Sequence, residues 1–147
     1  MRTAGILMPI TSLPSPYGVG TLGQCARDFI QFLHRAGQTY WQILPICPTG
    51  YGDSPYQSFS SYAGNPYMID FDDLKKEGLL QEEEYASISW GDNPARVDYS
   101  LLYSHKFSIL RIACSRISGV LSERFQAFCK EQKVWLNDYA LYMSIKD

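Results

Sequence analysis

Long hydrophobic runs are missing from this 147-residue sequence. No stretch reaches the ~18 consecutive apolar residues of a membrane-spanning helix. Near the N-terminus, the apolar run Gly5–Met8 is too short for the hydrophobic part of a signal peptide, and it stops at Pro9. We therefore expect a cytoplasmic protein with no segment that crosses a membrane.

An excess of one charge is missing as well. The 13 basic and 15 acidic residues give a formal net charge of −2 and a pI of about 5.6. That balance argues against nucleic acid and anionic membranes as partners, because both attract a concentrated basic surface. With 46% hydrophobic and 19% charged residues, the composition is that of a globular protein and not of a disordered chain.

Metal-binding patterns are absent too. The sequence has two histidines and four cysteines, and the cysteines form no C-x-x-C pair and no zinc-site spacing. They are Cys25, Cys47, Cys114 and Cys129. We expect free thiols and no metal site.

The first part of the sequence has a β-α-β pattern. The apolar segment Gly5–Met8 predicts a buried strand, and Thr39–Leu44, rich in β-branched and aromatic residues, predicts a second. Between them, Thr21 and Gln24 have the spacing of a capping box, and Gly37 marks the end of the helix. The two strands should be parallel with a right-handed crossover. The apolar face of this helix would consist of Leu22, Ala26, Phe29, Ile30 and Leu33.

Beyond residue 70 the pattern is helical. We expect short segments at 72–77 and 82–84, a helix from an N-cap at Asp98 to about Ile117, and a last helix that begins at Ser122. The last helix should bury a stripe consisting of Phe125, Phe128, Cys129, Trp135, Leu136, Tyr139 and Met143. A two-stranded parallel sheet and an uncapped final helix together predict an incomplete barrel or sheet.

The segment Pro45–Tyr67 is a long loop rich in proline, glycine and serine. Asp53 is its one charged residue, so it has neither the lysine of a phosphate-binding loop nor the carboxylate cluster of a metal site. Its aromatic and neutral polar side chains suit a sugar, whose C–H faces stack on rings and whose hydroxyls need neutral partners. We expect Tyr51 and Tyr56 to be exposed for binding, and Phe59 and Tyr67 to pack the loop down.

Asp53 is ambiguous by itself, because an Asp between Gly and Ser-Pro is often a turn residue. If the preceding strand belongs to a (β/α)₈ barrel, the loop lies at the C-terminal face, where such enzymes build their active sites.

Five motifs in the first half of the chain resemble, in the same order, those of the amylomaltases, which are 4-α-glucanotransferases. They are Thr11–Pro14, Tyr17–Gly20, Tyr40–Gln42, Pro48–Ser58 and Ala63–Tyr67. A looser resemblance resumes at Arg96–Tyr103 and at Asp138–Leu141.

The resemblance implies an α/β fold: the N-terminal part of a (β/α)₈ barrel, residues 1–74, followed by a helical insertion subdomain, residues 75–147. It also implies retaining transfer of α-1,4-glucan segments between maltodextrins, with an Asp nucleophile, a Glu acid/base and no cofactor. The family's catalytic carboxylates come from later strands, so we assign no catalytic residue. We expect this chain to be inactive alone and to need the remainder of the same barrel.

By the same resemblance, Tyr56 and Ser54 match positions that line the donor side of the glucan groove, and Tyr51 and Tyr103 match an additional glucan contact. Asp53, as a shaper of the turn, and Asn65 complete the substrate-binding candidates. The expected partner is an α-1,4-glucan or maltooligosaccharide. Two alternatives remain: a stand-alone α-glucan-binding module without catalysis, and a scaffold that binds no ligand.

Overall fold

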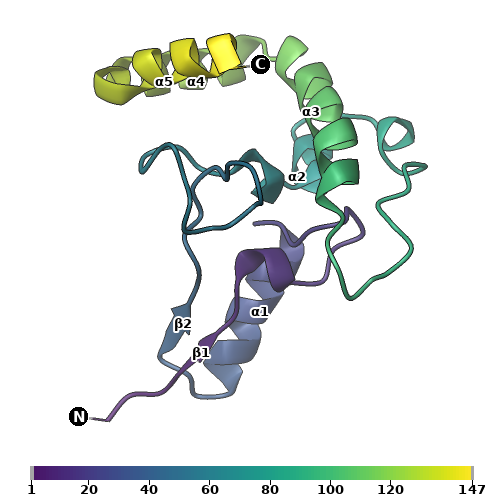
Figure 1. The fold of residues 1–147 in the computed structure, drawn as a ribbon, viewed down its shortest axis with the longest axis vertical. Helices are drawn as coiled ribbons and strands as arrows, with labels where there is room; N and C mark the ends of the chain where they lie inside the picture. The colour runs from purple at the N-terminus through teal and green to yellow at the C-terminus, as the bar shows by residue number, and fades with distance from the viewer. Residues whose placement is uncertain (1, 147) are drawn as a thin grey trace.

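The computed structural model describes residues 2–146, which form two short strands, five α-helices and three 3₁₀ turns (Figure 1). In chain order the elements are β1 (Gly5–Leu7), η1 (Ile10–Ser12), α1 (Gln24–Arg35), β2 (Tyr40–Gln42), η2 (Pro66–Met68), α2 (Phe71–Lys76), η3 (Glu82–Glu84), α3 (Tyr99–Ser115), α4 (Gly119–Glu131) and α5 (Lys133–Lys146).

The strands β1 and β2 are parallel, and α1 connects them and lies beside them (Figure 1). The register pairs Ile6 with Trp41, and the Trp41 ring meets Phe29 of α1 edge-on at 5.0 Å. The predicted β-α-β unit is therefore confirmed, although both strands are shorter than expected. The predicted burial of the first strand is wrong: Leu7 is 55% exposed, because among residues 2–146 only these two strands form the sheet.

The start of α1 also differs from the prediction. Gly23, not Thr21, is the N-cap, and no side chain caps the helix. The Thr21 hydroxyl instead donates a 2.5 Å hydrogen bond to Asp70, far along the chain. The expected apolar face is only partly buried, since Ala26 and Leu33 are covered while Leu22 and Ile30 are exposed.

The main core joins the N-terminal loop to the helical part of the chain. Its buried members are Tyr17, Phe71, Leu79, Leu80, Tyr85, Ile109 and Ala113. A smaller cluster of Val19, Tyr67 and Leu102 fixes the end of the long loop against α3. Asp70 and Asp98 are the N-caps of α2 and α3, and each accepts a backbone N–H bond, so the predicted cap at Asp98 is confirmed.

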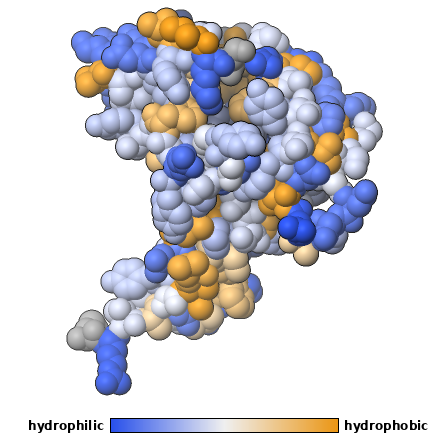
Figure 2. Space-filling view, viewed as in Figure 1, coloured by the Kyte–Doolittle hydropathy of each residue, from blue (hydrophilic) through white to orange (hydrophobic). Residues whose placement is uncertain are grey.

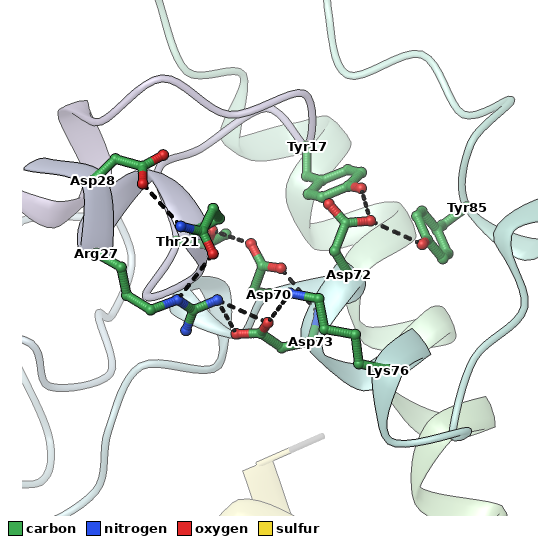
Figure 3. Close-up of polar contacts among 10 residues, drawn as sticks. Tyr17, Thr21, Arg27, Asp28, Asp70, Asp72, Asp73, Lys76 and Tyr85 are labelled. Atoms are coloured by element: carbon green, nitrogen blue, oxygen red, sulfur yellow. Dashed lines mark hydrogen bonds and ion pairs between the residues drawn. The ribbon is translucent and has the colours of Figure 1, made fainter.

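Ion pairs and hydrogen bonds hold α1 against α2 (Figure 3). The Arg27 guanidinium donates to both oxygens of Asp73, at 2.9 and 3.0 Å, and Lys76 pairs with the same carboxylate at 2.9 Å. The Arg27 hydrogen bond, with help from Lys76, lowers the pKa of Asp73. These contacts orient the segment that leaves the long loop.

The last predicted helix is two helices, α4 and α5, separated at Gln132. The prediction of a buried stripe here is wrong: neither helix contains a fully buried residue, and Phe125 and Phe128 are 56% and 45% exposed. An apolar stripe is buried only where another surface covers it. In Figure 2 apolar atoms gather at the top of the view, where α4 and α5 lie.

Candidate functional site

The long loop leaves β2 at the carboxyl ends of both strands. A small cavity of about 30 Å³ lies there, between Pro9, which follows β1, and Leu44, which follows β2. The cavity is also lined by Asp53 and Asn65 of the loop and by the ring of Tyr67. The loop therefore lies at the carboxyl ends of the strands, which is where parallel α/β folds bind ligands.

Two consecutive turns form a projecting segment at residues 49–58, which we call the finger. The Asp53 N–H donates to Gly50 O at 3.1 Å, and the Gln57 N–H donates to Ser54 O at 3.0 Å. An antiparallel bridge between Thr49 and Ser58 closes the base. The finger is thus an ordered element that holds its own backbone hydrogen bonds.

Asp53 has a turn conformation that few non-glycine residues adopt. Its φ of +53° is the only positive value for a non-glycine residue between 2 and 146, and its carboxylate accepts a 3.3 Å hydrogen bond from the Thr49 hydroxyl. Burial, and then the nearby charge of Asp53, raises the pKa of Tyr67 to about 12. The Asp53 carboxylate therefore lies near the buried tyrosine that supports the loop, and both residues line the loop cavity.

The two tyrosines of the finger extend away from the protein. Tyr51 is fully exposed and Tyr56 is 75% exposed, and neither ring contacts another ring in the described residues. Tyr67 is buried and Phe59 half-buried, as expected for residues that pack the loop down. The structure thus separates ring faces that are free for a ligand from those that hold the loop.

Ser54 and Asn65 differ in what their side chains do. The half-buried Ser54 hydroxyl makes no hydrogen bond within residues 2–146, so it is free to pair with a ligand. Asn65 accepts the Tyr67 N–H at 3.0 Å, and its backbone N–H donates to Ile46 O at 2.8 Å. Asn65 therefore caps η2 and closes the base of the loop.

Tyr103 lies outside the loop, on α3. Its ring is 69% exposed and meets Phe107 edge-on at 6.1 Å. It is close enough to Tyr67 for its charge to contribute to that residue's raised pKa. No ring contact joins Tyr103 to Tyr51 in the described part of the chain.

Sequence reasoning missed the role of α5, whose aromatic residues Trp135, Tyr139 and Tyr142 contact the loop. We call these three the α5 aromatic face. Trp135 stacks on Tyr62, and Phe59 contacts both tyrosines of the face. The spacing of three aromatics along one helix face was the available signal, but it did not indicate the loop as their partner.

Carboxylates line the loop cavity and a second cavity beside α2. Asp53 is the only carboxylate among the described residues that line the loop cavity. Beside α2 lies a second cavity of about 200 Å³, where Asp72 accepts hydrogen bonds from the Tyr17 and Tyr85 hydroxyls at 2.7 and 3.1 Å (Figure 3). Glu82 in that cavity is paired with Lys75.

Between residues 2 and 146, no three His, Cys, Asp or Glu side chains are grouped to hold a metal ion. No helix of that range is both long and apolar enough to cross a membrane.

A β-α-β unit with an aromatic, nearly uncharged loop at the carboxyl ends of its strands defines an α/β protein with a loop suited to neutral ligands. The family model described as 4-alpha-glucanotransferase matches residues 8–147. This chain belongs to that family.

Curated relatives agree. The chain is 48% identical over 139 residues to the 4-alpha-glucanotransferase of Clostridium butyricum and 50% identical over 149 residues to that of Thermus thermophilus. These matches cover 95% and 99% of this chain but only 28% and 29% of the relatives. The chain therefore spans about three tenths of the length of the relatives it matches.

A solved structure has the same fold over this range. It is the amylomaltase from Streptococcus agalactiae in complex with acarbose, with a TM-score of 0.95 and 42% sequence identity. The match covers 99% of this chain and 30% of that one.

Proposed function

We propose that this protein binds α-1,4-glucans through the finger, as the substrate-binding part of a cytoplasmic 4-α-glucanotransferase. Tyr51 and Tyr56 offer open ring faces on which pyranose rings stack, and the Ser54 hydroxyl offers a neutral hydrogen-bonding partner. Asp53 shapes the turn that presents them. Tyr103 and Asn65 border the same region, Tyr103 as a further ring and Asn65 as the support of the loop.

The observation that carries this proposal is the contrast between exposed rings and absent charge. Both finger tyrosines are exposed and contact no other ring among the described residues, and Asp53 is the only charged residue between Ile46 and Ile69. Exposed aromatics beside neutral polar groups favour an uncharged ligand with apolar faces and many hydroxyls. The acarbose complex of the similar amylomaltase supports a glucan-like ligand.

The chemistry that we propose for the whole enzyme is retaining transfer of a glucan segment to another sugar. That reaction uses two carboxyl groups about 5–5.5 Å apart. We propose that the nucleophile and the acid/base lie elsewhere in the enzyme, and the single carboxylate among the described residues at the loop cavity, Asp53, supports this. We further propose that residues 1–74 belong to a (β/α)₈ barrel completed by the remainder of the enzyme, and that residues 75–147 form a helical insertion.

Calorimetric titration of the protein with maltoheptaose tests the proposal. Tyr56→Ala should weaken binding about tenfold, the equivalent of one stacking contact of ~1.4 kcal/mol. Tyr40→Ala is the matched control, because Tyr40 is 61% exposed on β2 and its ring contacts no other. Unchanged affinity in Tyr56→Ala, or no binding by the wild type, would overturn the assignment.

An activity assay separates binding from catalysis. We expect no disproportionation of maltotriose by this chain alone. Glucose release that depends on Tyr56 would show that a catalytic pair is present after all. Tight glucan binding by a monomer that unfolds cooperatively would favour a stand-alone binding module.

A further inference from the structure

We propose that Tyr62, whose ring lies nearly parallel to that of Trp135 on α5, is a further stacking platform for a pyranose ring of the glucan. The inference rests on the proposed function, because it extends the same glucan path from the finger toward α5. It assigns a ligand contact to the loop beyond residue 58 and a positioning role to the helical part of the chain.

The ring geometry supports a platform with one open face. The Tyr62 and Trp135 rings are nearly parallel, with centroids 5.8 Å apart and planes inclined by 17°. Trp135 is half-buried, whereas Tyr62 remains 74% exposed. Because the two parallel rings are offset, the indole contacts the phenol ring and leaves most of its area exposed, where a sugar C–H face can stack.

Hydrogen bonds fix both rings of the pair. The Ser60 hydroxyl oxygen accepts the backbone N–H groups of Tyr62 and Ala63 at 3.2 and 3.1 Å, which sets the backbone of this turn. On α5, the indole N–H of Trp135 donates to the Gln132 side chain at 2.8 Å, which sets the orientation of the indole. The platform is therefore ordered before any ligand arrives.

A second contact ties the same turn to α5. Phe59 stacks on Tyr139, with centroids 6.4 Å apart and an inclination of 15°, and also contacts Tyr142 at 5.6 Å. The Lys146 ammonium nitrogen lies 4.3 Å from the centroid of the Phe59 ring. With Phe59 anchored in this way, the loop backbone that carries Tyr62 cannot move away from α5 without breaking several contacts.

Pre-ordering makes Tyr62 different from the finger tyrosines. Tyr51 and Tyr56 have no ring neighbours, so a ligand must restrict their motion when it binds. Ordering a side chain on binding costs conformational entropy, and a ring that is already held avoids most of that cost. Tyr62 therefore offers its ring face at a lower entropic cost than Tyr56 does.

The ligand we infer is a maltooligosaccharide long enough to reach both Tyr56 and Tyr62. The loop segment between them has no charged side chain, which suits a neutral sugar. Short glucans should occupy the finger alone. The sensitivity of binding to glucan length is therefore the property that distinguishes this platform from a packing contact.

Calorimetry with maltotriose and maltoheptaose tests the platform. Tyr62→Ala should weaken maltoheptaose binding about tenfold and leave maltotriose binding nearly unchanged, whereas Tyr62→Phe, which keeps the ring, should bind both as the wild type does. The matched control is Val134→Ala, because Val134 lies next to Trp135 on α5 and is 85% exposed. Wild-type affinity for maltoheptaose in Tyr62→Ala, with weakened affinity in Tyr56→Ala, would overturn the platform and leave the proposed function intact.

The positioning role of Trp135 is tested by two measurements, glucan affinity and hydrogen exchange in the turn that carries Tyr62. Trp135→Ala should weaken maltoheptaose binding and also speed hydrogen exchange at the amides of Tyr62 and Ala63, while Trp135→Phe, which can still stack, should restore both. Unchanged exchange and affinity in Trp135→Ala would show that α5 does not position the ring. If the wild type binds neither sugar, the proposed function fails and the platform fails with it.

Discussion

The Lys106 ammonium nitrogen lies 4.8 Å from the centroid of the Phe71 ring, inside the main core. The residue is fully buried, and its ammonium has no hydrogen-bond partner in the described residues. Burial lowers the pKa of Lys106 to about 8, and the charge of Asp70 opposes the shift only in part. A cation–π contact with Phe71 thus adds to the charge of Asp70 in compensating for the desolvated ammonium.

Replacement of Lys106 by Met should stabilise the protein at pH 7. The folded-state pKa of about 8 is below the unfolded value near 10.5, so the unfolded state binds more protons between these values. Stability conferred by the wild-type lysine therefore rises with pH across this window, and the advantage of Lys106→Met, roughly 2–3 kcal/mol at pH 7, should shrink by pH 10. Urea unfolding of both proteins at several pH values measures the difference. A constant difference would contradict the buried charge.

Gly23→Ala should destabilise the protein by about 1–3 kcal/mol. A Cβ at this position would collide with the Asp70 carboxylate, which also accepts the Thr21 hydroxyl and caps α2. The clash would therefore disturb the junction of α1 and α2. Gly64→Ala is the control, since a Cβ there meets nothing within 4 Å. Thermal unfolding should separate the two variants, and equal melting temperatures would contradict this account.

Substitution of Asp53 tests whether its backbone conformation or its carboxylate matters. Asp53→Ala should cost roughly 1–2 kcal/mol, because alanine disfavours the φ of +53°. Asp53→Gly relieves that strain and should keep the stability while it removes the carboxylate. If glucan affinity follows stability, Asp53 only shapes the turn. Affinity lost in the stable glycine variant would instead identify the carboxylate as a ligand contact.

Acid should weaken the contact between η3 and the end of α3. Two hydrogen bonds from the Arg116 guanidinium, with the Gln81 N–H, lower the pKa of Glu84 to about 2 from its ordinary value of 4.5. The stability that this pair contributes is therefore present above pH 4.5 and is lost as the pH falls toward 2. Glu84→Gln should flatten the pH dependence of the urea midpoint in that range. Glu83→Gln, at a neighbouring exposed position, should leave it unchanged.

Local patterns predicted the elements of this fold where the determining contacts are local. The parallel strands, the positions of α1 and α3 and the cap at Asp98 follow from apolar period and capping chemistry. Thr21 had the right spacing for a cap of α1, but its hydroxyl donates to Asp70 instead. Spacing along the sequence does not reveal a hydrogen-bond partner that is distant in the chain.

The site was predictable in its composition and not in its tertiary contacts. The exposure of Tyr51 and Tyr56 followed from the turn residues around them. The pairing of Tyr62 with Trp135 could not be read from sequence, because each residue taken alone fits ordinary packing. The burial of the apolar stripe on α4 and α5 was predicted wrongly for the same reason. Periodicity identifies an apolar face of a helix but does not show whether another surface covers it.

The parallel pairing of β1 and β2 has a consequence for the order of assembly. Parallel strands cannot meet until the intervening chain has folded back, and the entropy of closing that connection must be overcome first. The local hydrogen bonds of α1 form much faster than such a closure, so we expect helix before sheet. The loop leaves directly from β2, so its correct presentation is a late event. The rate at which glucan binding recovers during refolding would therefore report how fast β1 and β2 pair in their native register.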